Sequence, residues 1–315
     1  MGLTVSSFRL QLPATSANLG AAFDTAAVAL GFHLVVEAEE AERFSIAAKG
    51  RNADLCSRIE DNLILETYRN LLAREGRDAV PLALRMENQI PLGMGCGSSA
   101  AGRLAAIALA SHFGGLEWSS ERILAEACML EGHPDNAAAC WLGGLVVAAC
   151  EGEVIHSARV EPPAEWRAMV VMPAAPLATS KARAVLPERY SRADAVANIQ
   201  AAALLGLAFA QRRGDLLRPA MADRLHQPYR SEICPLLPLL LPLAGNHGIL
   251  GAALSGAGPS VLLVLSGDES VTRARKSVLD AIAGQLEVEV LVARFERRGV
   301  TRNLNSVNEV ETAGR

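Results

Sequence analysis

The sequence contains almost no lysine. Only three of its 30 basic residues are lysines, at Lys49, Lys181 and Lys276, and the other 27 are arginines. No glycine-rich loop ends in the lysine that a Walker-type P-loop requires, so this class of nucleotide-binding protein is excluded. The net charge of −4 also argues against a protein that must neutralise the phosphates of a nucleic acid.

Paired cysteines and long apolar runs are lacking as well. The six cysteines form no C-x-x-C pair, so a zinc ribbon or a dithiol motif has no support, and we expect reduced, buried thiols. The longest apolar run, 201–210, is shorter than the about 20 helical residues that span a bilayer. No signal peptide is visible. We therefore expect a soluble cytoplasmic protein with no membrane or nucleic-acid partner.

Half of the 315 residues are hydrophobic, which is enough for a large core and excludes intrinsic disorder. Alternating apolar residues predict a series of strands, the first of which are 8–12, 32–38, 43–48 and 82–88. Runs rich in alanine and leucine predict helices at 98–112 and 192–213. This irregular order of strands and helices favours an α+β fold over a doubly wound parallel sheet.

The Pro162-Pro163 pair is the best candidate for a domain boundary. We predict an N-terminal domain at 1–162, a C-terminal domain at 163–305 and a polar tail at 306–315. The polar chain beyond residue 302 is expected to be frayed. Near the N-terminus, residues 13–25 are rich in turn formers and are expected to form a turn-rich stretch.

A glycine-rich loop lies between a predicted strand and a predicted helix. It reads Pro91-Leu-Gly-Met-Gly-Cys-Gly-Ser-Ser-Ala-Ala101. Glycine lets the backbone approach a ligand closely, and the helix that begins near Ser98 directs its free N–H groups and its positive dipole end at the loop. The pattern fits a phosphate site, although an ordinary turn with a serine N-cap explains it equally well.

Three further segments combine polar and turn-forming residues. Glu131-Gly-His-Pro-Asp-Asn136 carries carboxylates that suit Mg²⁺, but it also reads as a turn between helices. Ser255-Gly-Ala-Gly-Pro-Ser260 reads as a hairpin turn. The segment Pro13-Ala-Thr-Ser-Ala-Asn-Leu-Gly20, followed by Phe23 and Asp24, allows a similar interpretation.

Together, these four segments resemble the motifs of the GHMP kinases in order and spacing. Asn18, Phe23-Asp24 and His133-Pro-Asp-Asn136 make the chain most similar to the homoserine kinases within that superfamily. The resemblance extends over roughly residues 8–295, and it departs from the usual pattern at Cys96, where leucine is common.

The resemblance implies an N-terminal domain like ribosomal protein S5 domain 2 and a ferredoxin-like C-terminal domain, with the active site in the cleft between them. It also implies ATP-dependent phosphorylation of the L-homoserine hydroxyl to O-phospho-L-homoserine, on the threonine pathway.

The resemblance assigns ATP and Mg²⁺ to particular residues. ATP is assigned to Pro91, Gly93, Gly95, Gly97, Ser98, Ser99, Ala100 and Ala101. Asn62, in the Asp61-Asn62-Leu63 segment, matches a stretch near adenine, although a plain helix N-terminus accounts for it too. Mg²⁺ is assigned to Ser98 and Glu131, with Glu126 as the second candidate for the carboxylate.

The implied acceptor is a zwitterion. Arg183 and Arg230 match positions that clamp its carboxylate, a task suited to the two-pronged guanidinium, although surface arginines in ion pairs would look the same. The ammonium group is assigned to the side-chain oxygens of Asn18, Asp24 and Asp135. His133, as a hydrogen-bonding residue, and Gly258 complete the predicted acceptor-binding set.

The catalytic residues predicted from the resemblance are Ser99, Asp135 and Asn136. Several GHMP relatives carry an aspartate where this chain has Asn136, and asparagine cannot accept a proton. Transfer without a protein base is therefore implied, with Asn136 orienting the hydroxyl and the proton leaving to phosphate or solvent.

Two alternatives remain open at this point. A GHMP kinase for another small hydroxy amino acid, such as L-threonine, would differ only in its pocket. A catalytically silent regulator should have lost Ser98, Ser99 or Glu131, and all three are present. Because relatives are often dimers, a homodimer is also expected.

Overall fold

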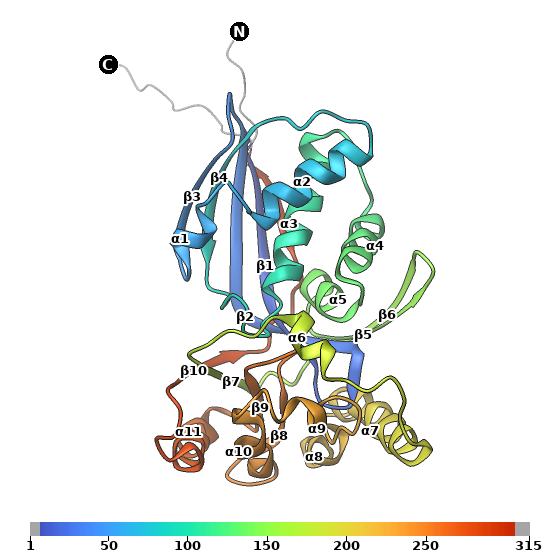
Figure 1. Ribbon diagram of the computed structural model, residues 1–315, viewed down its shortest axis with the longest axis vertical. Helices are drawn as coiled ribbons and strands as arrows, with labels where there is room; N and C mark the ends of the chain where they lie inside the picture. Colours follow the sequence, from blue (N-terminus) through green and yellow to red (C-terminus); the bar gives the residue numbers. More distant parts are fainter. Residues whose placement is uncertain (1–6, 306–315) are drawn as a thin grey trace, which may run out of the picture.

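The computed structural model describes residues 7–305 and the side chains of residues 7–302. Its strands form two separate sheets, one of seven strands and one of four, which lie one above the other along the long axis of the molecule (Figure 1). The fold is thus α+β, as the irregular order of elements predicted.

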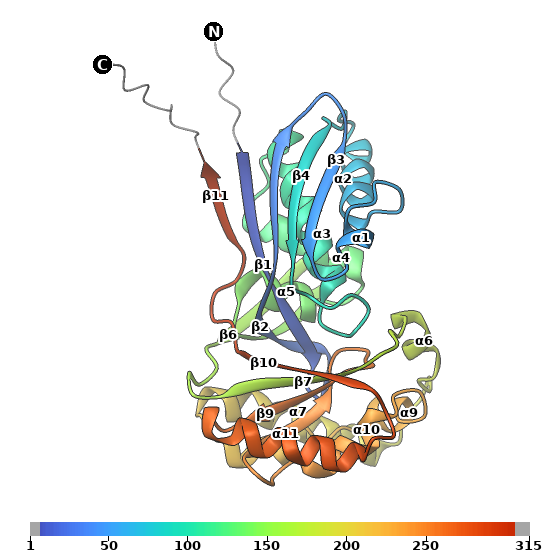
Figure 2. The same ribbon diagram turned by 90° about the vertical axis from the view of Figure 1, so that its left-hand side faces the viewer.

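The seven-stranded sheet runs in the order β11-β1-β2-β4-β3, with the hairpin of β5 and β6 attached to β2. Only β3 and β4 are parallel. Its strands are β1 (Ser7–Asn18), β2 (Ala22–Glu40), β3 (Ser45–Gly50), β4 (Leu82–Asn88), β5 (Leu145–Glu151), β6 (Val154–Val160) and β11 (Thr301–Asn305). Its helices are α1 (Ala53–Cys56), α2 (Leu63–Arg74), α3 (Ser98–Phe113), α4 (Ser120–Glu131) and α5 (Asp135–Leu142). Figure 2 shows these helices behind the sheet.

Helix α3 is the central helix of this half. Eleven of its 16 residues are buried, and they are mostly alanine with Leu104, Ile107 and Leu109. A helix that is apolar all round fits a position between a sheet and other helices, and α3 does pack against α2, α4 and β1. Its start is fixed by Gly97, whose φ of 71° lies in the left-handed region that favours glycine.

The four-stranded sheet runs in the order β10-β7-β9-β8 and is antiparallel throughout. Its strands are β7 (Arg167–Pro173), β8 (Ile249–Leu254), β9 (Val261–Leu265) and β10 (Val288–Arg294). Its helices include α6 (Thr179–Ala184), α7 (Arg192–Ala210), α8 (Leu217–Ala220), α9 (Gln227–Arg230), α10 (Leu236–Leu240) and α11 (Asp268–Ile282), with 3₁₀ turns at Gly214–Leu216 and Leu241–Leu243. Helices α8, α10 and α11 lie below this sheet in Figure 1, whereas α7 also contacts β2 and β6 of the first sheet.

Two expectations about the ends of the first sheet are wrong. Residues 13–25 form strand rather than loop, apart from a short turn at 19–21, because a register shift after Pro13 lets β1 continue its pairing with β2 to Asn18. The chain is also not frayed at residue 302, since β11 pairs with β1 through its backbone, which a polar sequence can do at a sheet edge. The predicted tail at 306–315 lies outside the described residues.

Helix α7 is long and apolar enough, by length and composition alone, to cross a membrane, and 28% of that stretch is buried. A single helix of this kind is weak evidence, because core helices of soluble proteins meet the same test. It packs here against α8, the 3₁₀ turn at Gly214–Leu216, β2 and β6. The domain boundary at Pro162-Pro163 stays a prediction.

Candidate active site

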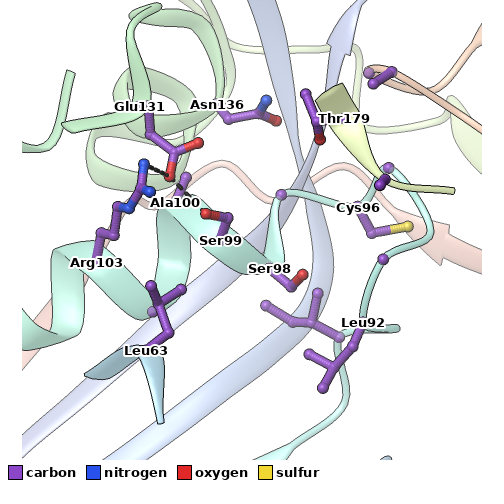
Figure 3. A pocket seen from close by; sticks show the side chains of 18 of the residues that line it. Leu63, Leu92, Cys96, Ser98, Ser99, Ala100, Arg103, Glu131, Asn136 and Thr179 are labelled. Atoms are coloured by element: carbon purple, nitrogen blue, oxygen red, sulfur yellow. Dashed lines mark hydrogen bonds and ion pairs between the residues drawn. The ribbon is translucent and has the colours of Figure 1, made fainter. Parts of the chain in front are cut away.

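A cavity of about 800 Å³ lies where the four polar segments meet, and residues from both halves of the chain line it. This volume is within the usual range of small-molecule sites, about 300 to 1,000 Å³. Figure 3 shows the part of it around the start of α3, with side chains from α3, α4, α5 and α6 facing the same space.

The glycine-rich loop and the Ser255–Ser260 turn are held directly against one another. Ser255 Oγ donates a hydrogen bond to the Gly95 carbonyl at 2.7 Å. A Cβ at Gly95 would lie 2.1 Å from the Ser255 carbonyl oxygen, and the φ of Gly95 is +72°. Glycine is therefore required here by the approach of a second backbone as well as by its conformation.

The loop leads directly into the N-terminus of α3. Gly93, Gly95 and Gly97 all have φ near +70°, and Ser98 and Ser99 form the first helical turn, where backbone N–H groups have no partner within the helix. All five residues, with Ala100, line the cavity. This geometry can bind phosphate groups without a lysine.

Two residues assigned to the nucleotide do not line the cavity. Ala101 is completely buried in the core beneath α3. Pro91 lines a second, smaller cavity of about 250 Å³ beside Arg51 and Glu289.

Glu131, at the end of α4, has its carboxylate held from two sides. Its Oε1 atom accepts hydrogen bonds from Ser99 Oγ at 2.7 Å and from Arg103 Nη1 at 2.8 Å (Figure 3). The serine in contact with this carboxylate is thus Ser99, while Ser98 lines the same cavity. Glu126 is absent from the lining and lies fully buried in an ion pair with Arg74 at 2.8 Å.

Asp135 and His133 form a compact pair at the start of α5. Asp135 Oδ1 lies 2.6 Å from His133 Nδ1 and accepts the Asn136 backbone N–H, also at 2.6 Å. Burial opposes a charge on His133, but the hydrogen bond and charge of Asp135, together with the charges of Asp24 and Glu131, outweigh this effect and raise the pKa of His133. One ligand atom each from Asp24, His133 and Asp135 lie within 4.8 Å of one another.

Asn136 is oriented by a residue that the sequence analysis did not single out. Thr15 Oγ1 donates to Asn136 Oδ1 at 2.7 Å, across 121 positions of the chain. The carbonyl end of the amide is therefore occupied. Thr179, at the start of α6, also lines the cavity, and Figure 3 shows it on the same side as Asn136. Thr15 lies within the Pro13–Gly20 segment, but no role was assigned to it there, and Thr179 belongs to none of the four segments.

Arg183 reaches across from α6 to the N-terminal half. Its Nη1 and Nη2 donate to the two carboxylate oxygens of Asp24 at 3.0 and 2.7 Å. The pair is partly exposed, with 39% of the Arg183 side chain and 30% of the Asp24 side chain accessible. The predicted anion-binding and cation-binding groups thus neutralise each other in this structure.

Arg230 lies deeper, at the end of α9, and is 1% exposed. Its Nε donates to the Ala182 carbonyl at 3.0 Å, and its Nη1 lies 3.1 Å from His226 Nδ1. Among residues 7–302, no carboxylate forms an ion pair with it. Burial and the nearby charge of Arg183 lower the pKa of Arg230. A buried guanidinium without an anion is costly, which indicates that the cavity receives one from a ligand.

The turn after β1 is joined to the Ser255–Ser260 turn by Asn18. Its Nδ2 donates to the Gly256 carbonyl at 2.8 Å, and its Oδ1 accepts the Asp24 N–H at 2.9 Å. Asn18, Asp24 and Gly258 all line the cavity. Asn18 therefore positions Asp24 in addition to any contact it makes with a ligand.

Asn62 caps helix α2 and lines the cavity as well. Its Oδ1 accepts the N–H groups of Ile64 and Leu65 at 3.1 and 3.3 Å, and its Nδ2 donates to the Cys56 carbonyl. Asn62 is thus an ordinary helix N-cap, and this role neither supports nor excludes the predicted contact with adenine.

Replacing Asn62 with alanine should lower the free energy of unfolding by about 1 to 2 kcal/mol, because two helix N–H groups lose their acceptor. Urea unfolding measures this loss. Ser119→Ala, which removes the cap of α4, is the matched control, and both variants should be destabilised. Weaker ATP binding in Asn62→Ala alone would support the predicted adenine contact. An Asn62→Ala variant as stable to urea as the unchanged chain would contradict the capping role of Asn62.

Comparisons with known proteins agree with this geometry. The models of the GHMP kinases N terminal domain and of the GHMP kinases C terminal domain match residues 62–144 and 205–283. A homoserine kinase of Solibacter usitatus is 44% identical over 86% of this chain and 90% of its own length. One of Deinococcus radiodurans is 39% identical over 81% and 83%.

Solved structures share the fold. A putative homoserine kinase of Listeria monocytogenes superposes with a TM-score of 0.74 at 29% identity, over 95% of this chain and all of its own. A homoserine kinase of Cytophaga hutchinsonii superposes with a TM-score of 0.79 at 23% identity, over 94% and 97%. The chain therefore belongs to the GHMP kinases, and within them to the homoserine kinase family.

Proposed function

We propose that this chain catalyses the transfer of the ATP γ-phosphoryl group to the side-chain hydroxyl of L-homoserine, giving O-phospho-L-homoserine. The main support for an amino-acid acceptor is Arg230, a buried guanidinium that faces the cavity without a carboxylate partner in the described part of the chain. A small amino acid supplies the missing anion.

The acceptor end of the cavity matches a zwitterion in both signs of charge. Arg183 and Arg230 both lie over the ring of Phe23, at 5.5 and 5.4 Å from its centre. Asp24 and Asp135 supply carboxylates a short distance away. When the acceptor binds, its carboxylate can replace the Asp24 carboxylate as the partner of the Arg183 guanidinium. Asp24 is then free to bind the ammonium group of the acceptor.

The nucleotide end supplies positioning and positive potential. The N–H groups of the loop and of the first turn of α3 surround the triphosphate, as the GHMP assignment implies. Arg103, which is paired with Glu131, lines the cavity one turn further along. Phosphoryl transfer depends mainly on such positioning and charge stabilisation. Asn136 orients the acceptor hydroxyl, whose proton leaves to phosphate or solvent.

The residues around Glu131 fit a divalent cation. Mg²⁺ prefers hard oxygen ligands, and Ser99 Oγ and Glu131 Oε1 lie 2.7 Å apart at the edge of the phosphate loop. We therefore assign the metal-binding role to Glu131 with the serines at the start of α3, Ser99 and Ser98. When bound, Mg²⁺ would neutralise charge on the β- and γ-phosphates.

Replacing Glu131 with glutamine should remove the Mg²⁺ dependence of ATP binding, because a neutral amide does not hold the cation. Titration of a fluorescent ATP analogue with and without Mg²⁺ measures this, with Glu126→Gln as the control carboxylate. A Glu131→Gln variant whose Mg²⁺ response equals that of the unchanged chain would contradict the assignment.

A coupled ADP-release assay with L-homoserine and with L-threonine tests the choice of acceptor. Homoserine should give the higher kcat/KM. L-Threonine is an isomer of L-homoserine whose hydroxyl lies on Cβ instead of Cγ. In a pocket shaped for homoserine this hydroxyl is out of place for transfer, and a misplacement of this size costs about 10²-fold. Preferred turnover of threonine would assign the pocket to that amino acid, and tight ATP binding without turnover would favour a regulator.

The location and assembly of the protein are part of the same proposal. A cytoplasmic enzyme accords with its cysteines, all six of which are free thiols, five of them buried. A homodimer is proposed from the family resemblance alone, and the mass of the full chain in solution tests it.

A further inference from the structure

His226 lies directly behind Arg230 and is completely buried. It immediately precedes α9, so that the imidazole and the guanidinium, four positions apart, lie on the same side of this short helix. His226 Nε2 is 2.8 Å from the Gly20 carbonyl oxygen, and His226 Nδ1 is 3.1 Å from Arg230 Nη1. His226 does not itself line the cavity.

These two contacts allow only one form of the ring. A guanidinium can only donate hydrogen bonds, so His226 Nδ1 must accept, and a carbonyl oxygen can only accept, so His226 Nε2 must donate. The ring is therefore the neutral tautomer with its hydrogen on Nε2. A second hydrogen, on Nδ1, would point at an N–H of Arg230 and repel it.

The charged groups around His226 act in opposite directions. Burial and Arg230 favour the neutral ring and lower the pKa of His226, while Asp223, whose carboxylate lies 3.6 Å from Nε2, and the more distant Asp24 act against them. Asp223 is already engaged, since its oxygens accept three backbone N–H groups, those of Leu225, His226 and Gln227.

The carbonyl that His226 holds belongs to the turn that carries the other half of the acceptor site. Gly20 lies between Asn18 and Asp24, and its φ of +80° and its contact with the Met221 backbone leave no room for a side chain. One imidazole thus connects the carboxylate-binding Arg230 to the turn that presents Asp24.

We infer that His226 is a positioning residue, which in its neutral form aims the Arg230 guanidinium at the acceptor carboxylate and fixes its distance from Asp24. This inference rests on the proposed function. It follows that the KM for homoserine depends on His226, whereas ATP binding and the transfer step do not. It also follows that acceptor binding weakens when His226 becomes protonated.

Two substitutions separate positioning from packing. His226→Asn places an amide oxygen close to the position of Nδ1 and does not titrate, whereas His226→Phe keeps a buried ring but offers no acceptor. His112→Asn and His112→Phe are control variants far from the cavity. The His112 ring stacks on Phe8 at the end of α3 and is exposed, unlike that of His226, although partial burial lowers its pKa too.

The kinetic constants should be measured from about pH 8 down to about pH 5.5, below the unperturbed pKa of histidine of about 6.5. In the unchanged chain, the KM for homoserine should stay nearly constant down to about pH 6.5 and rise only toward the acid end, because burial lowers the pKa of His226 below its usual value. His226→Asn keeps an acceptor for Arg230 but loses the contact with Gly20, so its KM at neutral pH should lie between those of the unchanged chain and of His226→Phe. Its acid rise should be smaller than in the unchanged chain, and the remainder belongs to His133, whose pKa Asp135 raises. His226→Phe should raise KM by about tenfold or more at every pH, since a buried donor loses its acceptor, with kcat and ATP affinity nearly unchanged.

Several results would overturn the inference. One is an unchanged KM in His226→Phe, and another is an acid rise in His226→Asn as large as that of the unchanged chain. A higher KM for homoserine, a lower kcat and a weaker ATP affinity in both variants, together with a lower melting temperature, would show that His226 contributes only to packing. Failure of the unchanged chain to bind homoserine calorimetrically would instead refute the proposed acceptor, and the inference with it.

Discussion

Replacing Arg230 with lysine is expected to raise the KM for homoserine by about tenfold or more, because a buried acceptor that loses its donor costs about 1 to 3 kcal/mol. Lysine keeps the charge, but a point charge cannot reproduce the contacts that Arg230 makes with Ala182 and His226 while it also reaches the ligand. ATP affinity should stay unchanged, because Arg230 lies at the acceptor end of the cavity. Steady-state kinetics with each substrate varied in turn measures both effects.

Arg183→Lys is the informative comparison. Arg183 is 39% exposed and already paired with Asp24, so its replacement should raise the KM for homoserine by only a few-fold, as partly exposed ion pairs contribute about 1 kcal/mol or less. Arg189→Lys, on the exposed surface, should have no effect. Normal homoserine binding in both Arg183→Lys and Arg230→Lys would refute the carboxylate clamp, even if the protein proved to be a kinase.

Replacing Asn136 with alanine is expected to lower kcat by about 10²-fold while the Kd for homoserine changes little. The reason is that a misplaced acceptor hydroxyl reduces the rate by about this factor even when binding is retained. Single-turnover kinetics with the phosphorylated product quantified separates this effect from product release.

Thr15→Val tests the orienting role of Asn136 through the residue that fixes its amide. Thr15 fixes the amide of Asn136 through its hydroxyl, and valine has nearly the same shape without that donor. Its kcat should fall as well, but by less than in Asn136→Ala, since the amide is still present. Turnover of Asn136→Ala equal to that of the unchanged chain would mean that another group orients the hydroxyl.

The local parts of this site could be predicted from the sequence because their signals are local. Alternating glycines followed by an alanine-rich run indicate a loop that enters a buried helix, and the loop with Gly93, Gly95 and Gly97 and helix α3 are confirmed. The position of Ser98 and Ser99 at the start of this helix follows directly, since the loop and the helix share a border.

The tertiary parts could not be predicted in this way. The contacts of Thr15 with Asn136 and of Arg103 with Glu131 join residues 121 and 28 positions apart. The depth of Arg230 depends on packing that no pattern in His226-Gln-Pro-Tyr-Arg230 reveals. The strand through 13–18 was missed for a similar reason, because the backbone of β2 pairs with turn-forming residues that have no strand pattern of their own.

The most direct test of the account is to identify the product of the full chain incubated with ATP, Mg²⁺ and L-homoserine by ³¹P and ¹³C NMR. The account predicts a phosphate monoester on the side-chain hydroxyl, formed in a one-to-one ratio with ADP. Formation of ADP with inorganic phosphate and no ester, or ATP binding with no reaction at all, would contradict it.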